Sequence, residues 1–310
     1  MYYTYFTLAI VFINFRACLI WRAKSRWFKH QPFCLTNSMD KHSNEHEVRI
    51  EQLKKLRARG INPYPSTTRR THEITLVLRE FDHLETSGGL VVIAGRIMAF
   101  REHGGASFID IEDGGGSIQI YCSEDAIKKQ DTEDLNYADL SAFLNMGDFI
   151  EIEGAVFITR QGEKTIRASY ARILSKALVS IPSKWYGIKD METRHRKRYL
   201  DLLLHKPLRD MFHRKAIFWN TMREFLLSRG FLEVDTPVLE NTTGGADARA
   251  FITHHNALDI DVYLRISAGE LWQKRLMVAG FEKTFEIGRI FRNEGIDLEH
   301  LQDYTQMECY

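Results

Sequence analysis

The sequence has few cysteines, and they lie far apart. Its four cysteines, Cys18, Cys34, Cys122 and Cys309, form no C-x-x-C pair, the spacing that zinc sites and redox motifs commonly use. This absence argues against a zinc centre and against a disulfide framework. It favours a reducing compartment, and we expect a cytoplasmic protein.

An excess of charge of one sign is also missing. Lysine and arginine total 42 and aspartate and glutamate total 41, so any nucleic-acid surface has to come from local clustering. The glycine run Gly114–Gly116 lacks the Lys-Ser/Thr of a Walker-type phosphate loop, and we interpret it as a turn between strands. The 310 residues, 44% of them apolar, are enough for two domains with packed cores.

Acidic residues are absent from the first 38 positions, and Tyr2 to Trp21 is nearly all apolar. Three interpretations stay open: a membrane anchor of about 20 residues, a transit-like leader, or a stretch translated from a start codon placed too early. We favour the third, because Met39 opens a polar segment and the leader lacks a basic n-region and a cleavage site. Residues 1–38 are therefore predicted to lie outside the fold, and no membrane partner is expected.

After residue 38 the apolar residues first follow a helical spacing and then, from Leu90, a period of two. Within residues 39–66, Glu45 to Arg59 is predicted to form a basic helix that ends at Gly60. Five strands and one helix, which lies between the third and fourth strands, are then predicted at 90–100, 106–113, 117–122, 133–144 (the helix), 147–159 and 164–178. This is the layout of an OB-fold, here over residues 67–180, whose strand faces commonly bind oligonucleotides.

Arg101, Phe108 and Gln119 are predicted to share one patch on this barrel. An aromatic ring, a guanidinium and an amide suit stacking and edge hydrogen bonding to unpaired bases. The alternative is that they are ordinary rim residues with no ligand.

The second half begins with a basic segment and a long helix. We interpret the cluster Arg194, Arg196, Lys197 and Arg198 as a solvated linker. Met211 to Arg229 is predicted to be an amphipathic helix that ends at Gly230. The strand that follows is broken at Pro237, which belongs at a strand end or an edge.

A long helix followed by Gly-Phe-Leu-Glu-Val-Asp-Thr-Pro, and later "FRNEG…HLQDYTQMECY", resembles the first two motifs of the class II aminoacyl-tRNA synthetases. The segments "GGADARAFITHHNALDIDVYLRIS", "ELWQKRLMVAGFEKTFEIGRIFRNEGID" and "HRKRYLDLL" are similar to the bacterial-type lysyl-tRNA synthetase family, from about Met39 to the end. Two departures are Ala250, where that family usually has proline, and Leu301-Gln302-Asp303-Tyr304, where it usually has Asn-Pro-Glu-Phe.

The resemblance implies an α+β protein. A five-stranded OB-fold barrel that binds the anticodon would precede a class II antiparallel-sheet catalytic domain at 181–310, incomplete after the second motif. It also implies a homodimer through the helix and strand of residues 211–239.

The resemblance assigns roles to individual residues. Arg292, Glu294 and His300 would be catalytic and, with Tyr304 on the adenine, would bind ATP, Arg292 holding the α-phosphate. The family's anticodon-binding positions correspond to Arg101, Phe108 and Gln119, and its lysine-binding positions to Gly245, Glu270, Glu308 and Tyr310. The residues themselves are compatible with this, because Tyr304, Gln306, Glu308 and Tyr310 alternate along one strand face and a buried ammonium requires a buried carboxylate.

The implied reaction joins L-lysine to ATP as lysyl-adenylate and then transfers lysine to the 3′ end of tRNA(Lys). Mg²⁺ would bridge the phosphates, although no metal ligand is expected within this chain. The Gly-rich third motif is absent before Tyr310, so the 310-residue polypeptide is expected to have little or no activity by itself. The alternatives are an aspartyl- or asparaginyl-tRNA synthetase and a tRNA-binding fragment without catalysis.

Overall fold

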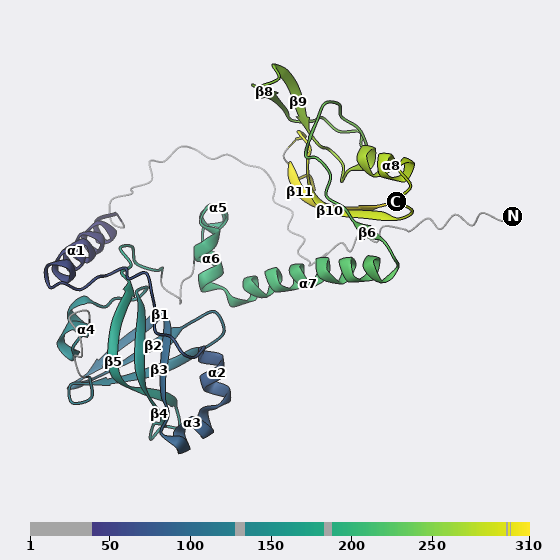
Figure 1. Cartoon of the computed structure of the whole chain (residues 1–310). Helices are drawn as coiled ribbons and strands as arrows, with labels where there is room; N and C mark the ends of the chain where they lie inside the picture. The colour runs from purple at the N-terminus through teal and green to yellow at the C-terminus, as the bar shows by residue number, and fades with distance from the viewer. Residues whose placement is uncertain (1–38, 128–133, 183–187, 296, 298) are drawn as a thin grey trace, which may run out of the picture. The chain divides into compact units, whose positions relative to one another are not determined.

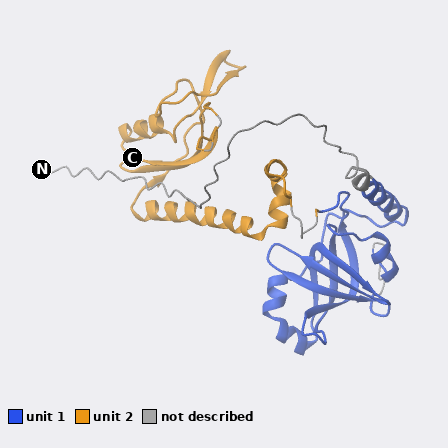
Figure 2. Cartoon of the chain, turned by 180° about the vertical axis from the view of Figure 1, so that it is seen from behind, with its two compact units in different colours: residues 1–181 blue, residues 182–310 orange. Residues whose placement is uncertain are grey.

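The computed structural model describes residues 39–127, 134–182, 188–295, 297 and 299–310, with the backbone alone for residues 39–43. The predictions made for residues 1–38 lie outside this range. The chain divides into two compact units, Met1–Ile181 and Pro182–Tyr310, which Figure 2 shows in different colours. No helix in the described part of the chain is long and apolar enough to cross a membrane.

The first unit is a closed five-stranded barrel with the strand order β1-β2-β3-β5-β4 (Figure 1). Its strands are β1 (Leu90–His103), β2 (Ala106–Glu112), β3 (Ser117–Ser123), β4 (Phe149–Ile158) and β5 (Lys164–Ser175). The helix α4 (Tyr137–Phe143) lies between β3 and β4, and Asn136 begins it with a capping box. The predicted fold class, an OB-fold barrel within an α+β protein, is confirmed.

Alternating isoleucines fill the barrel because successive side chains of a strand point to opposite faces. Ile93, Ile109, Ile152 and Ile166 are fully buried in one core cluster. Closure requires a glycine where β4 crosses β5, since a Cβ at Gly154 would lie 2.1 Å from the carbonyl oxygen of Arg167. The period-two pattern thus specifies both the strands and the face that forms the core.

Three helices precede the barrel strands in the sequence. They are α1 (Met39–Ala58), α2 (Ile74–Arg79) and α3 (Phe81–Ser87). The last two were not predicted, because helices of six and seven residues are too short to show a helical period. Arg49 of α1 is buried and donates to the carbonyls of Met146 (3.2 Å) and Ala177 (3.1 Å). This basic residue therefore fixes the helix to the barrel.

The second unit contains four helices and two small sheets in its described residues (Figure 1). The helices are α5 (Met191–Arg196), α6 (Arg198–Leu204), α7 (Lys206–Ser228) and α8 (Glu270–Val278). One sheet has the order β11-β10-β6, with β6 (Leu232–Glu233), β10 (Thr284–Phe291) and β11 (Asp303–Cys309). The other has the order β7-β9-β8, with β7 (Leu239–Glu240), β8 (Ile252–His255) and β9 (Ile260–Leu264).

The strand predicted around Pro237 is two strands in different sheets. β6 pairs in parallel with β10, whereas β7 pairs with β9. Pro237 lies in the connection between them, where its missing N–H disrupts no ladder. The long helix also starts earlier than predicted, at Lys206, with Pro207 in its first turn.

The basic segment before α7 is only partly a solvated linker. The side chain of Asp201 is fully buried and pairs with Arg194 Nε (2.9 Å), Arg198 Nη1 (2.8 Å) and His205 Nδ1 (2.8 Å). Burial acts to raise the pKa of Asp201, but the hydrogen bond from Arg194 and the other partners hold it below its ordinary value. Two of the four basic residues thus pair with Asp201, and one of them, Arg194, joins α5 to α6.

Candidate active site and nucleic-acid interface

The hairpin of β10 and β11 carries the predicted ATP-binding residues. Arg292 follows β10 and its backbone N–H donates to the carbonyl of Gln302 (2.9 Å), while Tyr304 pairs with Ile290 across the ladder. Arg292 Cζ lies 5.7 Å from the centre of the Tyr304 ring. The Arg292 Nε–H donates to the carbonyl of Ile266 (3.2 Å), which orients the two terminal nitrogens as a fork for an anion.

A short charged turn lies between these strands. Asp297 accepts hydrogen bonds from the backbone N–H groups of Glu299 and His300, and its carboxylate contacts His300 Nδ1 (2.7 Å). The hydrogen bond to Asp297, together with the charge of Glu294, raises the pKa of His300 above its ordinary value. The loop therefore presents a protonated His300 to a ligand over a wider pH range than a free imidazole would.

The predicted lysine-binding residues gather at the opposite end of β11. Burial raises the pKa of Glu308, and the neighbouring charge of Glu270 raises it further, while the Ala268 N–H and Arg292 oppose the shift. Burial and the charges of Glu270 and Glu308 raise the pKa of Tyr310 to about 12. These mutual effects show that Glu270, Glu308 and Tyr310 lie within electrostatic range of one another.

One oxygen of Glu308 has no donor among the described residues. Gln306 Nε2 donates to its Oε1, whereas its buried Oε2 has no well-formed hydrogen bond, the Ala268 N–H lying only near enough to lower the pKa of Glu308. A buried carboxylate oxygen without a donor is costly in a folded protein. The arrangement is suited to a ligand that brings its own N–H groups.

Gly245 lies against one of these carboxylates, that of Glu270. Its φ is +88°, and a Cβ there would lie 2.3 Å from Ser267 Oγ and 2.6 Å from Glu270 Oε2. Glu270 Oε1 meanwhile pairs with Lys274, one turn along α8. A side chain at position 245 would therefore collide with Ser267 and Glu270.

A buried ion pair lies within electrostatic range of Glu308, and it was missed from the sequence. Arg265 and Glu286, each about 3% exposed at the side chain, form a salt bridge, and Thr236 Oγ1 donates to Glu286 Oε2 (2.6 Å). Arg265 Nε also donates to the carbonyl of Arg289 (2.8 Å). No local signal separates this arginine from an exposed one at a strand end.

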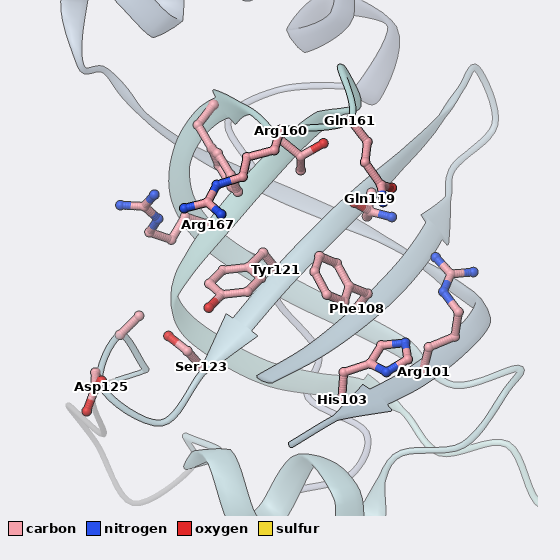
Figure 3. Close-up of a pocket in the computed structure, with 13 residues that line it drawn as sticks. Arg101, His103, Phe108, Gln119, Tyr121, Ser123, Asp125, Arg160, Gln161 and Arg167 are labelled. Carbon is pink, nitrogen blue, oxygen red and sulfur yellow. The ribbon is translucent and has the colours of Figure 1, made fainter. Parts of the chain in front are cut away.

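The three predicted anticodon-binding residues line one hollow on the barrel. Arg101, Phe108 and Gln119 all border a cavity of about 880 Å³. Figure 3 shows the rings of Phe108 and Tyr121 side by side on this face, with their centres 5.4 Å apart. The Gln119 side-chain oxygen accepts from Thr165 Oγ1 (3.1 Å), and the side chain borders the cavity.

Other members of this face were not singled out from the sequence. Phe157 lies 6.1 Å from Tyr121, and the Arg167 guanidinium lies 4.8 Å above the Phe157 ring. Both rings alternate with buried residues in their strands, a pattern that reveals the outward face but not a ligand. The aromatic row and its arginine form a surface of the kind that stacks single-stranded bases.

Profiles of known protein families match a segment in each of the two units. The family profile "tRNA synthetases class II (D, K and N)" matches residues 190–310, and "OB-fold nucleic acid binding domain" matches residues 91–174. The barrel, the β10–β11 hairpin and these matches define a class II aminoacyl-tRNA synthetase.

Lysine–tRNA ligases are among the most similar relatives. Those of Pelotomaculum thermopropionicum and Roseiflexus sp. are each 47% identical over 85% of this chain, covering 50% and 53% of their own lengths. That of Thermoanaerobacter sp. is 45% identical over 85% of this chain and 51% of its own length. The chain belongs to the lysine–tRNA ligase family, and it spans about half the length of the curated relatives it matches.

Proposed function

We propose that the second unit forms the ATP- and lysine-binding half of a lysine–tRNA ligase site. The reaction would join lysine to ATP as lysyl-adenylate, release pyrophosphate and transfer lysine to the 3′ end of tRNA(Lys) in the cytoplasm. The observation that carries the proposal is Glu308, a carboxylate with a buried oxygen that lacks a donor, beside a second carboxylate, Glu270. An ammonium group supplies both the missing donor and the opposite charge.

Each residue of the hairpin has a role that its contacts support. The Arg292 fork, oriented through its Nε, would hold the α-phosphate as negative charge develops there. The Tyr304 ring would stack on adenine in place of the family's phenylalanine. Glu294 and His300 would contact ATP from the loop, and Gly245 and Tyr310 would close the lysine pocket. Activation would then depend on positioning and electrostatics.

The Mg²⁺ that the family uses with ATP has no matching ligand set in the part of the chain that the structure describes. No group of three or more histidine, cysteine or acidic side chains there could hold a metal ion.

The pocket favours lysine over aspartate or asparagine. An aspartate side chain would place a third negative charge beside Glu270 and Glu308, and an amide would bring no positive charge to either carboxylate. We expect a non-hydrolysable lysyl-adenylate analogue to bind residues 39–310 at least about 100-fold more tightly than the aspartyl or asparaginyl analogue. Calorimetric titration of the three analogues tests this, and equal affinities would contradict the proposed substrate.

Residues 1–310 alone are expected to catalyse little or no lysine-dependent exchange of pyrophosphate into ATP. The Gly-rich third motif, whose arginine would hold the γ-phosphate, is absent from these residues, so an electrostatic contribution to the transition state is missing. The measurement is ATP–pyrophosphate exchange with lysine, against an intact relative as control. Turnover comparable to the intact enzyme would contradict the expectation, whereas tRNA binding without adenylate formation would favour a tRNA-binding fragment.

The barrel is proposed to bind the anticodon of tRNA(Lys) through Arg101, Phe108 and Gln119. Because one stacked base contributes about 1–3 kcal/mol, Phe108→Ala is expected to weaken binding of a uridine-rich RNA by about 5- to 150-fold. Fluorescence anisotropy with a labelled RNA measures the change. Phe100→Ala, which truncates an aromatic that packs against the barrel core, is the control for loss of stability, and an unaltered affinity of the Phe108 variant would contradict the role.

A homodimer through residues 211–239 is proposed from the exposed apolar face of α7. Phe212, Ile217, Phe218 and Phe225 are each more than half exposed, and large apolar patches commonly mark interfaces. Phe218→Glu is expected to raise the dimer dissociation constant by about 30-fold or more. Sedimentation velocity over a concentration series measures it, with Asn220→Glu, an exposed position on another face of the same helix, as the control. A parent chain that stays monomeric would contradict the proposal.

A further inference from the structure

An acidic residue lies inside the proposed nucleic-acid face. Asp110 of β2 accepts two hydrogen bonds from Arg101 of β1, from Nη1 to Oδ2 (2.9 Å) and from Nη2 to Oδ1 (2.8 Å). Its Cα is also the cross-strand partner of Gln119. One carboxylate thus lies between two of the three residues proposed to contact the anticodon.

The negative charge of Asp110 is unfavourable for binding RNA, the partner expected at this face. A carboxylate repels the phosphates of an RNA strand, so a plain ion pair would be placed more favourably elsewhere on the barrel. Asp110 is about 30% exposed and lines a second hollow, of about 590 Å³, that shares Arg101 and Gln119 with the first. The bidentate geometry restrains the guanidinium more than a single contact would.

The pair limits what Arg101 can do with a ligand. A guanidinium has five N–H donors, and two of them are used by Asp110, which leaves three in a fixed orientation and neutralises the charge. Arg101 can then still donate to a base edge, but its attraction to any phosphate is reduced. Contacts to base edges carry sequence information, whereas contacts to phosphates do not.

We infer that Asp110 is a specificity-determining residue of the barrel, which holds Arg101 as a reader of base edges and prevents it from acting as a general phosphate anchor. This inference rests on the proposed anticodon-binding function. It assigns to Asp110 a role that acts through Arg101, so removing the arginine should remove the effect of the acid.

The test uses the whole chain and two labelled seven-nucleotide RNAs, one of uridine and one of adenosine. Asp110→Asn is expected to bind the adenosine RNA more tightly and to lower the preference for uridine by about fivefold or more. If Arg101 gains one phosphate contact, the slope of log Kd against log salt should rise by about 0.7. Anisotropy titrations at four salt concentrations measure both quantities.

Two further variants make the result specific. Glu80→Gln removes the same charge from an exposed pair with Arg79 on the same unit and is expected to change neither preference nor slope. The double variant Arg101→Ala/Asp110→Asn is expected to behave as Arg101→Ala alone. Melting curves confirm that each variant is folded.

The outcomes distinguish a failure of the role inferred for Asp110 from a failure of the proposed anticodon binding. A parent chain that binds neither RNA overturns the anticodon-binding proposal and this inference with it. A parent that prefers uridine, with an Asp110→Asn variant of the same preference and salt slope, overturns only the role of Asp110. An effect of Asp110→Asn that persists without Arg101 also overturns it.

Discussion

Replacement of Glu286 by alanine is expected to destabilise the second unit by about 3–5 kcal/mol. Glu286 is 2% exposed, and the Arg265 that it neutralises is 3% exposed. Removing the carboxylate leaves a buried guanidinium without a counterion and Thr236 Oγ1 without its acceptor. A loss of this size is a large fraction of the stability of an ordinary domain.

Tryptophan fluorescence during urea unfolding of residues 39–310 measures this loss in the second unit alone. All tryptophans of that polypeptide, Trp185, Trp219 and Trp272, lie after residue 181, so the barrel does not contribute. The matched control is Glu233→Ala, which breaks a half-exposed pair with Arg223 and is expected to cost less than about 1 kcal/mol. Equal losses for both variants would show that the buried pair is not what holds the unit together.

The barrel could be predicted from the sequence because its information is local. Apolar and polar residues alternate along each strand, and the five strands appear in the structure close to their predicted positions. The boundaries differ by a few residues where a strand continues past the core, as β1 does to His103. Helices α2 and α3 were missed since two turns of helix show no resolvable period.

The supports of the candidate site could not be predicted in the same way. Arg265 is buried only because Thr236, from one segment, and Glu286 and the carbonyl of Arg289, both from β10, converge on it. The partners of Asp201 lie close to it in the sequence, in α5 and α6, and they turn part of a basic run into a structural cluster. A charged residue is exposed by default, and only the tertiary arrangement reverses that expectation.

The contacts of the polar face of β11 could be predicted only in part. Alternation predicts that Gln306 and Glu308 share a face, and their side chains do contact each other. It does not predict that a backbone N–H of a distant segment, that of Ala268, reaches Glu308. The candidate residues of the lysine site could thus be proposed from the sequence and the resemblance, while their electrostatics require the fold.

Glu308→Gln is expected to weaken binding of the lysyl-adenylate analogue to residues 39–310 by about 30-fold to several thousand-fold. The amide keeps the shape of the side chain but removes the charge that faces the substrate ammonium. It also replaces one carboxylate oxygen with an N–H₂ group, which cannot accept a hydrogen bond from the substrate ammonium. The buried Oε2, which has no donor from the protein, is the oxygen that would accept that bond. Calorimetric titration measures the loss, with Glu282→Gln, an exposed residue before β10, as the control.

The pH dependence gives an independent check because binding and stability should move in opposite directions. The pKa of Glu308 is raised by burial, so as pH falls the carboxylate is protonated earlier than an ordinary glutamate and lysine binding weakens. A raised folded-state pKa also means that the folded chain binds this proton more tightly than the unfolded chain. The contribution of Glu308 to stability is therefore present at low pH and lost as pH rises through that pKa. In the Glu308→Gln variant both pH-dependent changes should disappear together, and their persistence would assign them to another group.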